Sequence, residues 1–367
     1  MREEALILVF MLLISSLFAI YENAENRILA QTGDPGIIAL LQENGNVVLG
    51  NFISFLSTVN PLYLISSFEA SYPLLVFSKV KLTPERNRIL KATLRANNEF
   101  YSHHLSPLKS FYAVSFADSA PYNNVFLVNS SFKSTLPYVH YNFRGLALYP
   151  VTALHWAEMY FQRGKEGKAL EVLRELQSYL IIKNYQGLEY AVFENYFHFE
   201  NSSIPWISGY AQGLGAGLYA RAYNITKNES YLKTAQLLMN SFRVPYSKGG
   251  FTVNSTYGLW ILEYAYNSNE LVLNGHIIAL QGVYYYWEIT NDTYAKWVFD
   301  EGVRAVEKAL PDFDENGWSL YSNIHGRAME NYHELHIQLL EWLYEKTKNE
   351  KFKEYAEKWR ESLQNVG

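Results

Sequence analysis

The spacing of apolar residues predicts the last helix of the chain. Phe352, Tyr355, Ala356, Trp359 and Leu363 recur at intervals of three and four, which places them on one face of an α-helix. Six charged residues between 351 and 360 occupy the opposite face. The pattern therefore predicts an amphipathic helix over 350–364 with a single buried stripe.

Seven further helices are predicted, and all eight are arranged as pairs around short polar turns. The turns at 226–229 (Thr-Lys-Asn-Glu), 290–293 (Thr-Asn-Asp-Thr) and 347–350 (Thr-Lys-Asn-Glu) are spaced 64 and 57 residues apart, and 163–166 (Arg-Gly-Lys-Glu) takes the same place earlier. Less charged helices precede the turns at 146–162, 206–225, 271–289 and 332–346. More charged helices follow at 166–182, 229–243, 293–310 and 350–364. The first set is expected to be buried on most sides and the second to be amphipathic.

Glycine-aromatic stretches with strand character separate the helical pairs. They lie at 187–190, 249–252 and 317–321 and are predicted to form short hairpins or extended loops. Buried inner helices, amphipathic outer helices and crossing loops at one end describe a mainly α fold. We predict an (α/α) toroid or incomplete barrel of helix hairpins, with short β-hairpins and loops at one end.

The region before the helical pairs is harder to interpret. A helix is predicted within 82–104, beginning near Thr83-Pro84 because proline is tolerated in a first helical turn, and 105–143 appears rich in strands and loops. We divide the chain into a leader (1–20), a helical and β cap region (21–144) and an (α/α) catalytic domain (145–367). A separate small domain is the alternative for the middle region.

The first twenty residues resemble an export signal. Residues 5–20 read ALILVFMLLISSLFAI, an uncharged apolar run of 16 residues, which suits a signal peptide better than a complete membrane span. The flanking charges are atypical and no clear cleavage site follows, so the segment would also serve as an N-terminal membrane anchor. We expect the protein to be extracellular or to belong to the cell envelope.

Composition narrows the classes of partner. The chain has 367 residues, a net charge of −5 and no cysteine, which argues against nucleic-acid binding and excludes disulfides and thiolate chemistry. It carries 30 tyrosines, whose rings and hydroxyls suit a cleft that stacks on sugars and hydrogen-bonds them, although many will simply fill the core. The outer helices are compatible with a homodimer, but nothing in the sequence specifies one.

Four motifs in order resemble the catalytic domain of the D-glucuronyl C5-epimerases, over roughly residues 145–365. The first motif is Trp206 with Ala-Gln-Gly at 211–213 and Arg-Ala-Tyr at 221–223. The second is Leu-Glu-Tyr at 262–264, followed ten residues later by Leu-Asn-Gly at 273–275. The third is Leu-Pro at 310–311, then an aspartate, a glycine and Tyr321, and the fourth is Tyr332-His333 with His336, Gln338 and Leu339. The resemblance implies a metal-independent isomerase without a cofactor that acts on glucuronyl residues of a polysaccharide.

Such an enzyme removes the proton at C5, next to the sugar carboxylate, and returns it from the other face. A base and an acid must therefore lie within hydrogen-bond reach of that carbon. The resemblance implies that Glu263 and Tyr332 form the opposed pair and that Tyr264 and Tyr321 are further catalytic or orienting hydroxyls. If Glu263 and Tyr264 lay in a regular strand they would point to opposite faces, so both reach the cleft only from a bulge or irregular loop.

The resemblance also suggests residues that bind the substrate. These are Tyr149, Trp206, Tyr210, Gln212, Asn274, Arg327, His333 and His336. Before Tyr332 the family's Arg-x-x-Tyr pattern is replaced by Glu330-Asn331, and Arg327 is the nearest cation, either a carboxylate ligand or a surface residue. This departure favours an unsulfated uronic-acid glycan of a prokaryotic envelope over a sulfated precursor.

Other functions are compatible with parts of the pattern. His333-Glu334-Leu335-His336 is one residue shorter than the His-Glu-x-x-His zinc motif, so we predict no metal site there. A polysaccharide lyase would use the same proton abstraction, and a glycoside hydrolase on an (α/α) toroid would need a second carboxylate such as Glu334 or Glu194. A non-catalytic glycan-binding protein of the envelope would use the tyrosines only for stacking.

Overall fold

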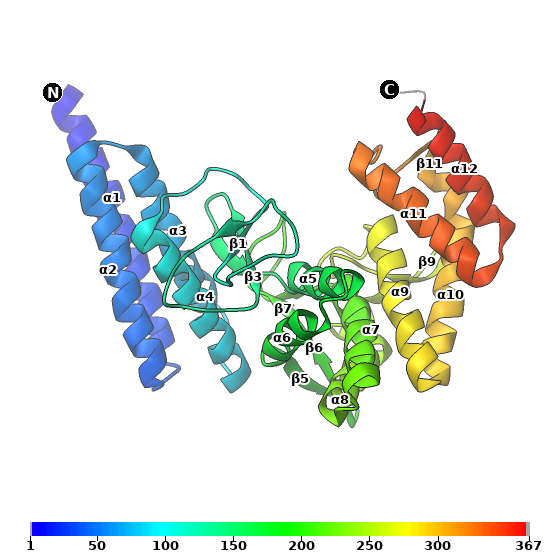
Figure 1. The fold of residues 1–367 in the computed structure, drawn as a ribbon. Coiled ribbons are helices and arrows are strands. Elements are labelled where there is room, and N and C mark those ends of the chain that lie inside the picture. Colours follow the sequence, from blue (N-terminus) through cyan, green and yellow to red (C-terminus); the bar gives the residue numbers. More distant parts are fainter. Residues whose placement is uncertain (1, 365–367) are drawn as a thin grey trace. The chain divides into compact units, whose positions relative to one another are not determined.

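The computed structural model describes residues 2–364, with side chains from residue 15 onward, and it is mainly helical, as predicted. The predicted leader therefore lies partly outside the described side chains. The chain divides into two compact units (Figure 1). The first unit takes the chain up to Tyr179 together with 195–205; the second takes 180–194 and everything from Trp206 onward. The predicted boundary at residue 144 was drawn from the resemblance and not from contacts between residues, and it stays a prediction.

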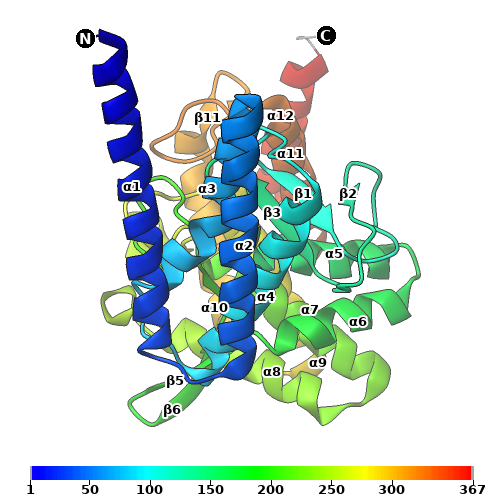
Figure 2. The same ribbon diagram turned by 90° about the vertical axis from the view of Figure 1, so that its left-hand side faces the viewer.

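The first unit begins with long antiparallel helices, seen side by side in Figure 2. They are α1 (Arg2–Leu29), α2 (Pro35–Thr58), α3 (Pro61–Phe77) and α4 (Pro84–His103). A small sheet follows in the order β2-β1-β3-β4, made of β1 (Tyr112–Ser115), β2 (Phe126–Leu127), β3 (Pro137–Tyr141) and β4 (Gly145–Leu148). Strand β2 is parallel to β1 and the other pairs are antiparallel. The helices α5 (Pro150–Gln162) and α6 (Glu166–Gln177) complete the unit.

The second unit contains three helix hairpins, each preceded by short strands. The inner helices are α7 (Gly209–Thr226), α9 (Leu273–Thr290) and α11 (Glu330–Thr347), and the outer ones are α8 (Glu229–Asn240), α10 (Thr293–Ala309) and α12 (Glu350–Gln364). The strands are β5 (Ile181–Tyr185), β6 (Leu188–Val192), β7 (Glu194–Asn195), β8 (Trp206–Ile207), β9 (Thr252–Ser255), β10 (Gly258–Ile261), β11 (Asp314–Glu315) and β12 (Trp318–Ser319). Since α9 packs on both α7 and α11, the hairpins form an arc, which confirms an incomplete (α/α) toroid.

At the start of the helix predicted over 206–225, Trp206–Ile207 form strand β8, so α7 begins only at Gly209. Two further predicted helix boundaries were wrong. Residues 146–148 pair with β3 as strand β4, so the helix begins only at Pro150. The helix predicted over 166–182 ends at Gln177, and β5 begins four residues later. Both segments are short apolar runs, which periodicity alone does not distinguish from helix. Their pairing with neighbouring strands decides the matter.

Glycines set the close approach of α7 to α9. A Cβ on Gly213 would lie 2.6 Å from the carbonyl oxygen of Ala279, and a Cβ on Gly217 would lie 2.6 Å from that of Gly282. Any larger residue would force the two inner helices apart, because backbone atoms cannot move aside. Small residues for helix packing therefore explain the glycine repeat in α7.

Candidate active site

Glu263 lies just past the end of β10, in the second unit. Residues 263–264 form a bend rather than a continued strand. The backbone on either side is fixed, because Leu262 donates to the carbonyl of Phe251 and Ala265 to that of Ile207. The bend removes the alternation of a regular strand, so that the side chains of both Glu263 and Tyr264 reach the same cluster.

Three phenols gather around this carboxyl group. The hydroxyls of Tyr264 and Tyr321 lie 3.0 Å apart, and Tyr264 also hydrogen-bonds the carboxyl of Glu263. The ring of Tyr321 packs edge-on against that of Tyr332, with centroids 5.2 Å apart. The four residues predicted to be catalytic are thus neighbours, although they come from the β10–α9 link, the β12–α11 link and the first turn of α11.

The carboxyl group of Glu263 has an unusually high pKa. Burial raises its pKa to about 8, and the nearby charge of Glu270 adds to the effect, while the hydrogen bond from Tyr264 opposes it. Its Oε2 atom is buried and has no hydrogen-bond partner among the described residues. A carboxyl group in this state can exchange protons near neutral pH, which is the property required of a general base or acid.

The tyrosines remain protonated under the same conditions. Burial and the charge of Glu263 both raise the pKa of Tyr321 and that of Tyr332. Each phenol is therefore a hydrogen-bond and proton donor at neutral pH, and neither is a phenolate base in the unliganded site. The division into one carboxyl base and phenolic acids follows from the electrostatics of the cluster.

Tyr332 differs from its neighbours in having an uncommitted hydroxyl group. The side chain is half-buried in the first turn of α11, and its hydroxyl makes no hydrogen bond among the described residues. The hydroxyl of Tyr321, in contrast, is engaged by Tyr264. Tyr332 is therefore the phenol best prepared to donate to a bound ligand.

Gly275, in the first turn of α9, makes room for the carboxyl group. A Cβ at this position would lie 2.2 Å from Glu263 Oε2 and 2.8 Å from its Cβ. We expect Gly275→Ala to displace the carboxylate and to reduce kcat by about 100-fold, because a misplacement of about 1 Å has that effect on a positioned group. Turnover and thermal unfolding should be measured together. Gly167→Ala, where a Cβ meets nothing within 4 Å, is the control.

Two buried histidines occupy equivalent positions in successive hairpins. His276 and His333 are each the fourth residue of an inner helix. Each ring stacks on a tryptophan of the short β-hairpin that precedes that helix, Trp260 and Trp318. The Nδ1 atom of each accepts a backbone N–H from that hairpin, and the Nε2–H donates to the carbonyl of an outer helix, Gly302 or Trp359. This neutral arrangement agrees with pKa values lowered by burial.

Gln212, the fourth residue of α7, makes the same contact to the preceding strand segment, but its amide donates to Ser208 and Phe193 and not to an outer helix. Its Oε1 accepts the backbone N–H of Phe193 at 2.9 Å, and its Nε2 donates to Ser208. His336 lies one turn beyond His333, and Ser319 Oγ is 2.8 Å from Nδ1 of both histidines. Gln212, His333 and His336 therefore tie the strand segments that precede α7 and α11 to those helices. No group of three acidic or histidine residues in the described part of the chain could hold a metal.

This equivalence predicts how the second unit responds to substitution at position 333. We expect His333→Ala to reduce stability by about 2–4 kcal/mol, because it leaves the buried N–H of Ser319 without its acceptor and removes the ring that stacks on Trp318. His333→Gln should cost clearly less, since its amide oxygen can accept the Ser319 N–H as Gln212 accepts that of Phe193. Denaturant unfolding of the two variants tests this; equal losses would contradict the proposed equivalence.

The remaining predicted binding residues are dispersed. Trp206 lies beside Tyr264 and Tyr266, with centroid distances of 6.2 and 5.5 Å, and Tyr210 is buried at the start of α7. Asn274 is buried and lies 3.5 Å from His336 Nε2. Arg327 pairs with Glu315 and its side chain is 53% exposed. Tyr149 precedes α5 in the first unit, so it is described separately from this cluster.

Two residues near the cluster were missed by the sequence analysis. Glu270 is buried, raises the pKa of Glu263, and lies 2.9 Å from Nδ1 of His325. His325 also packs edge-on against Tyr321 at 6.2 Å. Both lie in the links that carry the predicted catalytic residues, and this position was the one feature of the sequence that could have indicated them. Their isolated positions in the sequence gave no reason to select them.

Similarity to solved structures is low. A GH76 α-mannanase of Bacteroides thetaiotaomicron is 15% identical over 57% of each chain, with a TM-score of 0.39. A polysaccharide lyase is 14% identical over 88% of this chain and 77% of its own, with a TM-score of 0.40.

Similarity in sequence is concentrated in the second half of the chain. An uncharacterized protein of Methanocaldococcus jannaschii is 35% identical over 171 residues, which are 45% of this chain and 55% of that protein. The D-glucuronyl C5-epimerase of Caenorhabditis elegans is 28% identical over 173 residues, 42% of this chain and 28% of the enzyme. The chain thus matches about half, or less, of the length of these relatives. Residues 184–361, just under half of the chain, match the family described as D-glucuronyl C5-epimerase C-terminus.

Proposed function

We propose that this protein is a uronosyl C5-epimerase that inverts glucuronyl residues within a polysaccharide. The observation that carries the proposal is the buried Glu263 carboxyl, with a pKa near 8, surrounded by the phenols of Tyr264, Tyr321 and Tyr332. Inversion at C5 requires a base that removes the proton and an acid that returns one. A desolvated carboxylate and a protonated phenol meet that requirement.

In the proposed reaction, ionised Glu263 accepts the proton from C5. The electrons of the broken C–H bond move into the neighbouring sugar carboxylate, which becomes an enolate. The Tyr332 hydroxyl then donates its proton to the opposite face of C5. This leaves a protonated Glu263 and a Tyr332 phenolate, and transfer of one proton, directly or through water, restores both groups.

Tyr264 and Tyr321 are proposed to stabilise the charges that develop. Their hydroxyls are in contact with each other, and Tyr264 hydrogen-bonds the Glu263 carboxyl. This short chain of donors can reorient when Glu263 gains or loses its charge. Arg327 is paired with Glu315, and a sugar carboxylate would compete with Glu315 for this guanidinium. Trp206, Tyr210 and Asn274 are proposed to line the sugar site.

The finer features are also proposals. We propose that the reaction needs no metal, that the substrate is an unsulfated uronic-acid glycan of the envelope, and that the apolar run at 5–20 directs the protein out of the cytoplasm or holds it at the membrane. These rest on the sequence, and the chemistry of the cluster does not depend on them.

A lyase or a hydrolase is the second candidate. A lyase would abstract the same proton and then expel the substituent at C4. The buried Glu270 favours a hydrolase more than the sequence did, since it provides a second carboxyl group near Glu263. A non-catalytic glycan-binding protein would leave the high pKa of Glu263 without a use.

Incubation with uronic-acid polysaccharides in deuterated water, followed by NMR at C5, distinguishes these candidates. Deuterium at C5 with both epimers present supports the proposal. An unsaturated uronate would show a lyase, and new reducing ends would show a hydrolase. Binding without any exchange across a panel of such glycans would contradict the proposed epimerase.

A further inference from the structure

The turn between α2 and α3 is an uncharged version of the turns in the second unit. In 58–61 (Thr-Val-Asn-Pro), the Thr58 hydroxyl accepts the N–H of Asn60 at 3.3 Å, as the Thr226 hydroxyl accepts that of Asn228 at 3.2 Å. The residue between them has a left-handed backbone in each case, with φ of 55° at Val59 and 57° at Lys227. The corresponding residues in the other two turns are Asn291 and Lys348, with φ of 56° and 58°.

Val59 is an unusual residue for this position. A β-branched side chain in the left-handed region is a clear outlier and is less favourable than asparagine or lysine. The side chain is nevertheless 76% exposed, so it gains nothing from packing within the chain. An exposed valine in the turn between α2 and α3 is explained if the medium around this turn is itself apolar.

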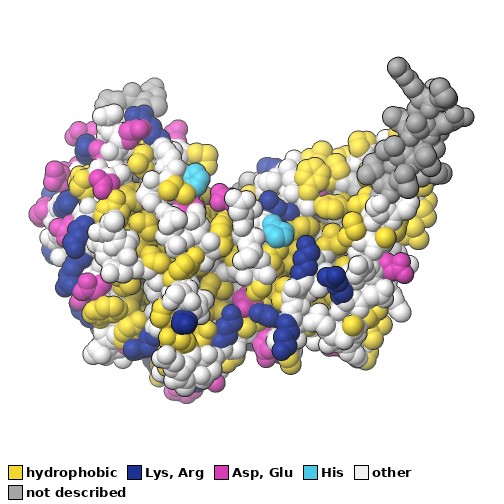
Figure 3. Space-filling view, turned by 180° about the vertical axis from the view of Figure 1, so that it is seen from behind, with side chains coloured by type: hydrophobic (Ala, Val, Ile, Leu, Met, Phe, Trp, Pro, Cys, Tyr) yellow, Lys and Arg dark blue, Asp and Glu magenta, His cyan; other side chains and the backbone are white. Residues whose placement is uncertain are grey.

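The helices on either side of this turn, α2 and α3, are also uncharged and apolar near it. No residue from 44 to 68 is charged, in a chain that is 18% charged overall. Leu49, Ile53 and Leu56 form an exposed stripe along α2, at the i, i+4, i+7 spacing of one helix face. In Figure 3 apolar and uncharged atoms dominate the surface of the N-terminal helices beside the grey atoms, whereas charged side chains gather over the C-terminal helices.

Three hydroxyl groups of α2 and the backbone donors of the turn are satisfied within the chain. The exposed hydroxyls of Ser54, Ser57 and Thr58 each donate to the backbone carbonyl four residues earlier. In the turn, the backbone N–H groups of 59, 60, 62 and 63 all find acceptors between residues 55 and 60, and Pro61 has none to satisfy. Satisfying backbone donors internally is the condition for placing a turn in a low-dielectric medium.

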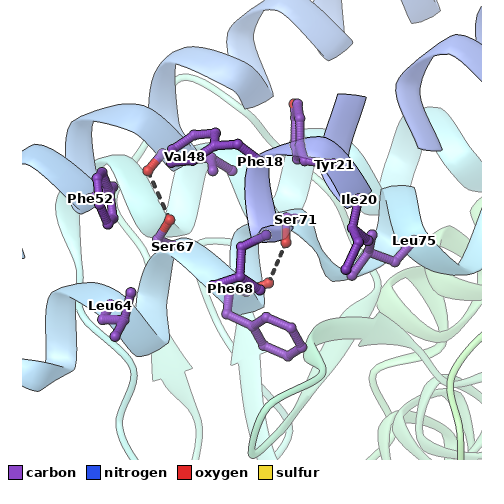
Figure 4. A pocket seen from close by; sticks show the side chains of 11 residues that line it. Phe18, Ile20, Tyr21, Val48, Phe52, Leu64, Ser67, Phe68, Ser71 and Leu75 are labelled. Carbon is purple, nitrogen blue, oxygen red and sulfur yellow. Dashed lines mark hydrogen bonds between the residues drawn. The ribbon is translucent and has the colours of Figure 1, made fainter. Parts of the chain in front are cut away.

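The N-terminal half of α1 ends at the same side of the unit. It runs antiparallel to α2, with Phe18 edge-on to Phe52 at 5.3 Å, and it extends past the α2–α3 tip (Figure 1). An apolar cavity of about 230 Å³ lies between α1, α2 and α3, lined by side chains including Phe18, Val48, Phe52 and Leu64 (Figure 4). The uncharged run at 5–20 therefore continues the apolar character of the tip.

We propose that the α2–α3 tip, defined as residues 49–63, inserts into one leaflet of a lipid bilayer beside the N-terminal half of α1. From Leu49 to Val59 the helix rises about 15 Å, which is half the thickness of a hydrocarbon core. Among the residues whose side chains are described, from residue 15 onward, no helix is both long and apolar enough to cross a membrane. The insertion is hydrophobic, because the tip carries no lysine or arginine for anionic headgroups.

The absence of cysteine from the chain allows a direct test. A polarity-sensitive fluorophore on Val59→Cys of the full chain is expected to shift its emission to the blue, and to become protected from a water-soluble quencher, when phosphatidylcholine vesicles are added. The same label on Lys227→Cys, at the equivalent turn of the second unit, should not respond. A Val59 label that stays in water while α1 alone binds the vesicles would overturn the proposal.

Charge substitutions give an independent measurement. We expect Val59→Lys combined with Ile53→Lys to lower partitioning into these vesicles by more than about tenfold, with little dependence on salt. Lysine occupies the same backbone position at 227 and 348, so the turn should still form. Ile225→Lys, at another exposed apolar site, is the control. A fluorescence shift without vesicles that grows with protein concentration would instead indicate docking of a second copy and refute the proposal.

Discussion

Replacing Glu263 with glutamine is expected to abolish epimerisation and, at alkaline pH, to stabilise the fold. The substitution keeps the shape of the side chain but removes the group proposed to accept the C5 proton. Loss of a general base typically reduces the rate by about 10²–10⁴-fold. In the wild type, the rate should rise with pH until it levels off near 8, where the buried carboxyl becomes ionised. A flat profile between pH 6 and 9 would contradict the role of Glu263.

The effect on stability has the opposite sign and follows from the same pKa. Below pH 4.5 the carboxyl is protonated in both the folded and the unfolded state and the shift has no effect. Between about 4.5 and 8 only the unfolded state releases the proton, so the folded wild type loses stability as pH rises, by about 5 kcal/mol in total. Glu263→Gln avoids this loss. Its Tm advantage over the wild type should therefore grow from pH 5 to pH 8.

Glu69 provides a matched control in the first unit. It is also buried, but hydrogen bonds from His140, Tyr101 and the backbone of Phe143 outweigh burial and hold its pKa below the usual value. Its ionised form stabilises the fold, so Glu69→Gln should lower the Tm above its pKa. If both variants changed the Tm in the same direction, burial would not explain the pKa of Glu263.

Replacing Tyr332 with phenylalanine is expected to separate proton exchange from inversion. The hydroxyl makes no hydrogen bond to the described residues, so its removal should leave the fold intact and the ring in contact with Tyr321. Glu263 can still remove the C5 proton but can return it only to the same face. Solvent deuterium should therefore enter C5 without inversion, and epimer formation should fall by about 10²–10⁴-fold.

Binding and exchange measurements check this prediction. The affinity of Tyr332→Phe for the glycan should stay close to that of the wild type, because stacking is retained. Tyr321→Phe is the comparison, since its hydroxyl is part of the Tyr264 contact and its loss should slow both exchange and inversion. Epimer formation at the wild-type rate in Tyr332→Phe would exclude this hydroxyl as the second proton donor.

The helical framework could be predicted because its signals are local. The stripe in α12 and the polar turns at 226, 290 and 347 depend only on nearby residues, and the helices begin and end within a few residues of the predicted positions. The equivalence of the turn at 58–61 was not recognised from the sequence, because valine and proline replace its polar residues. Its φ angle and hydrogen bonds make it evident in the structure.

The roles of adjacent residues in α11 show where the sequence pattern was insufficient. Tyr332 and His333 were both predicted to contact the substrate, yet consecutive residues on a helix point about 100° apart. Tyr332 packs against Tyr321, while His333 stacks on Trp318 and bonds Trp359. The structure therefore places them in different environments, and only Tyr332 lies in the tyrosine cluster.

The sequence by itself determined the mainly helical architecture, the family model that residues 184–361 match and the residues that carry its motifs. Tertiary structure decided which of those residues meet and in what protonation state. The pKa of Glu263 depends on its burial, on Tyr264 and on the charge of Glu270, and the paired state of Arg327 depends on Glu315. Spacing along the chain encodes local periodicity, whereas desolvation and charge depend on distances that exist only once the chain has folded.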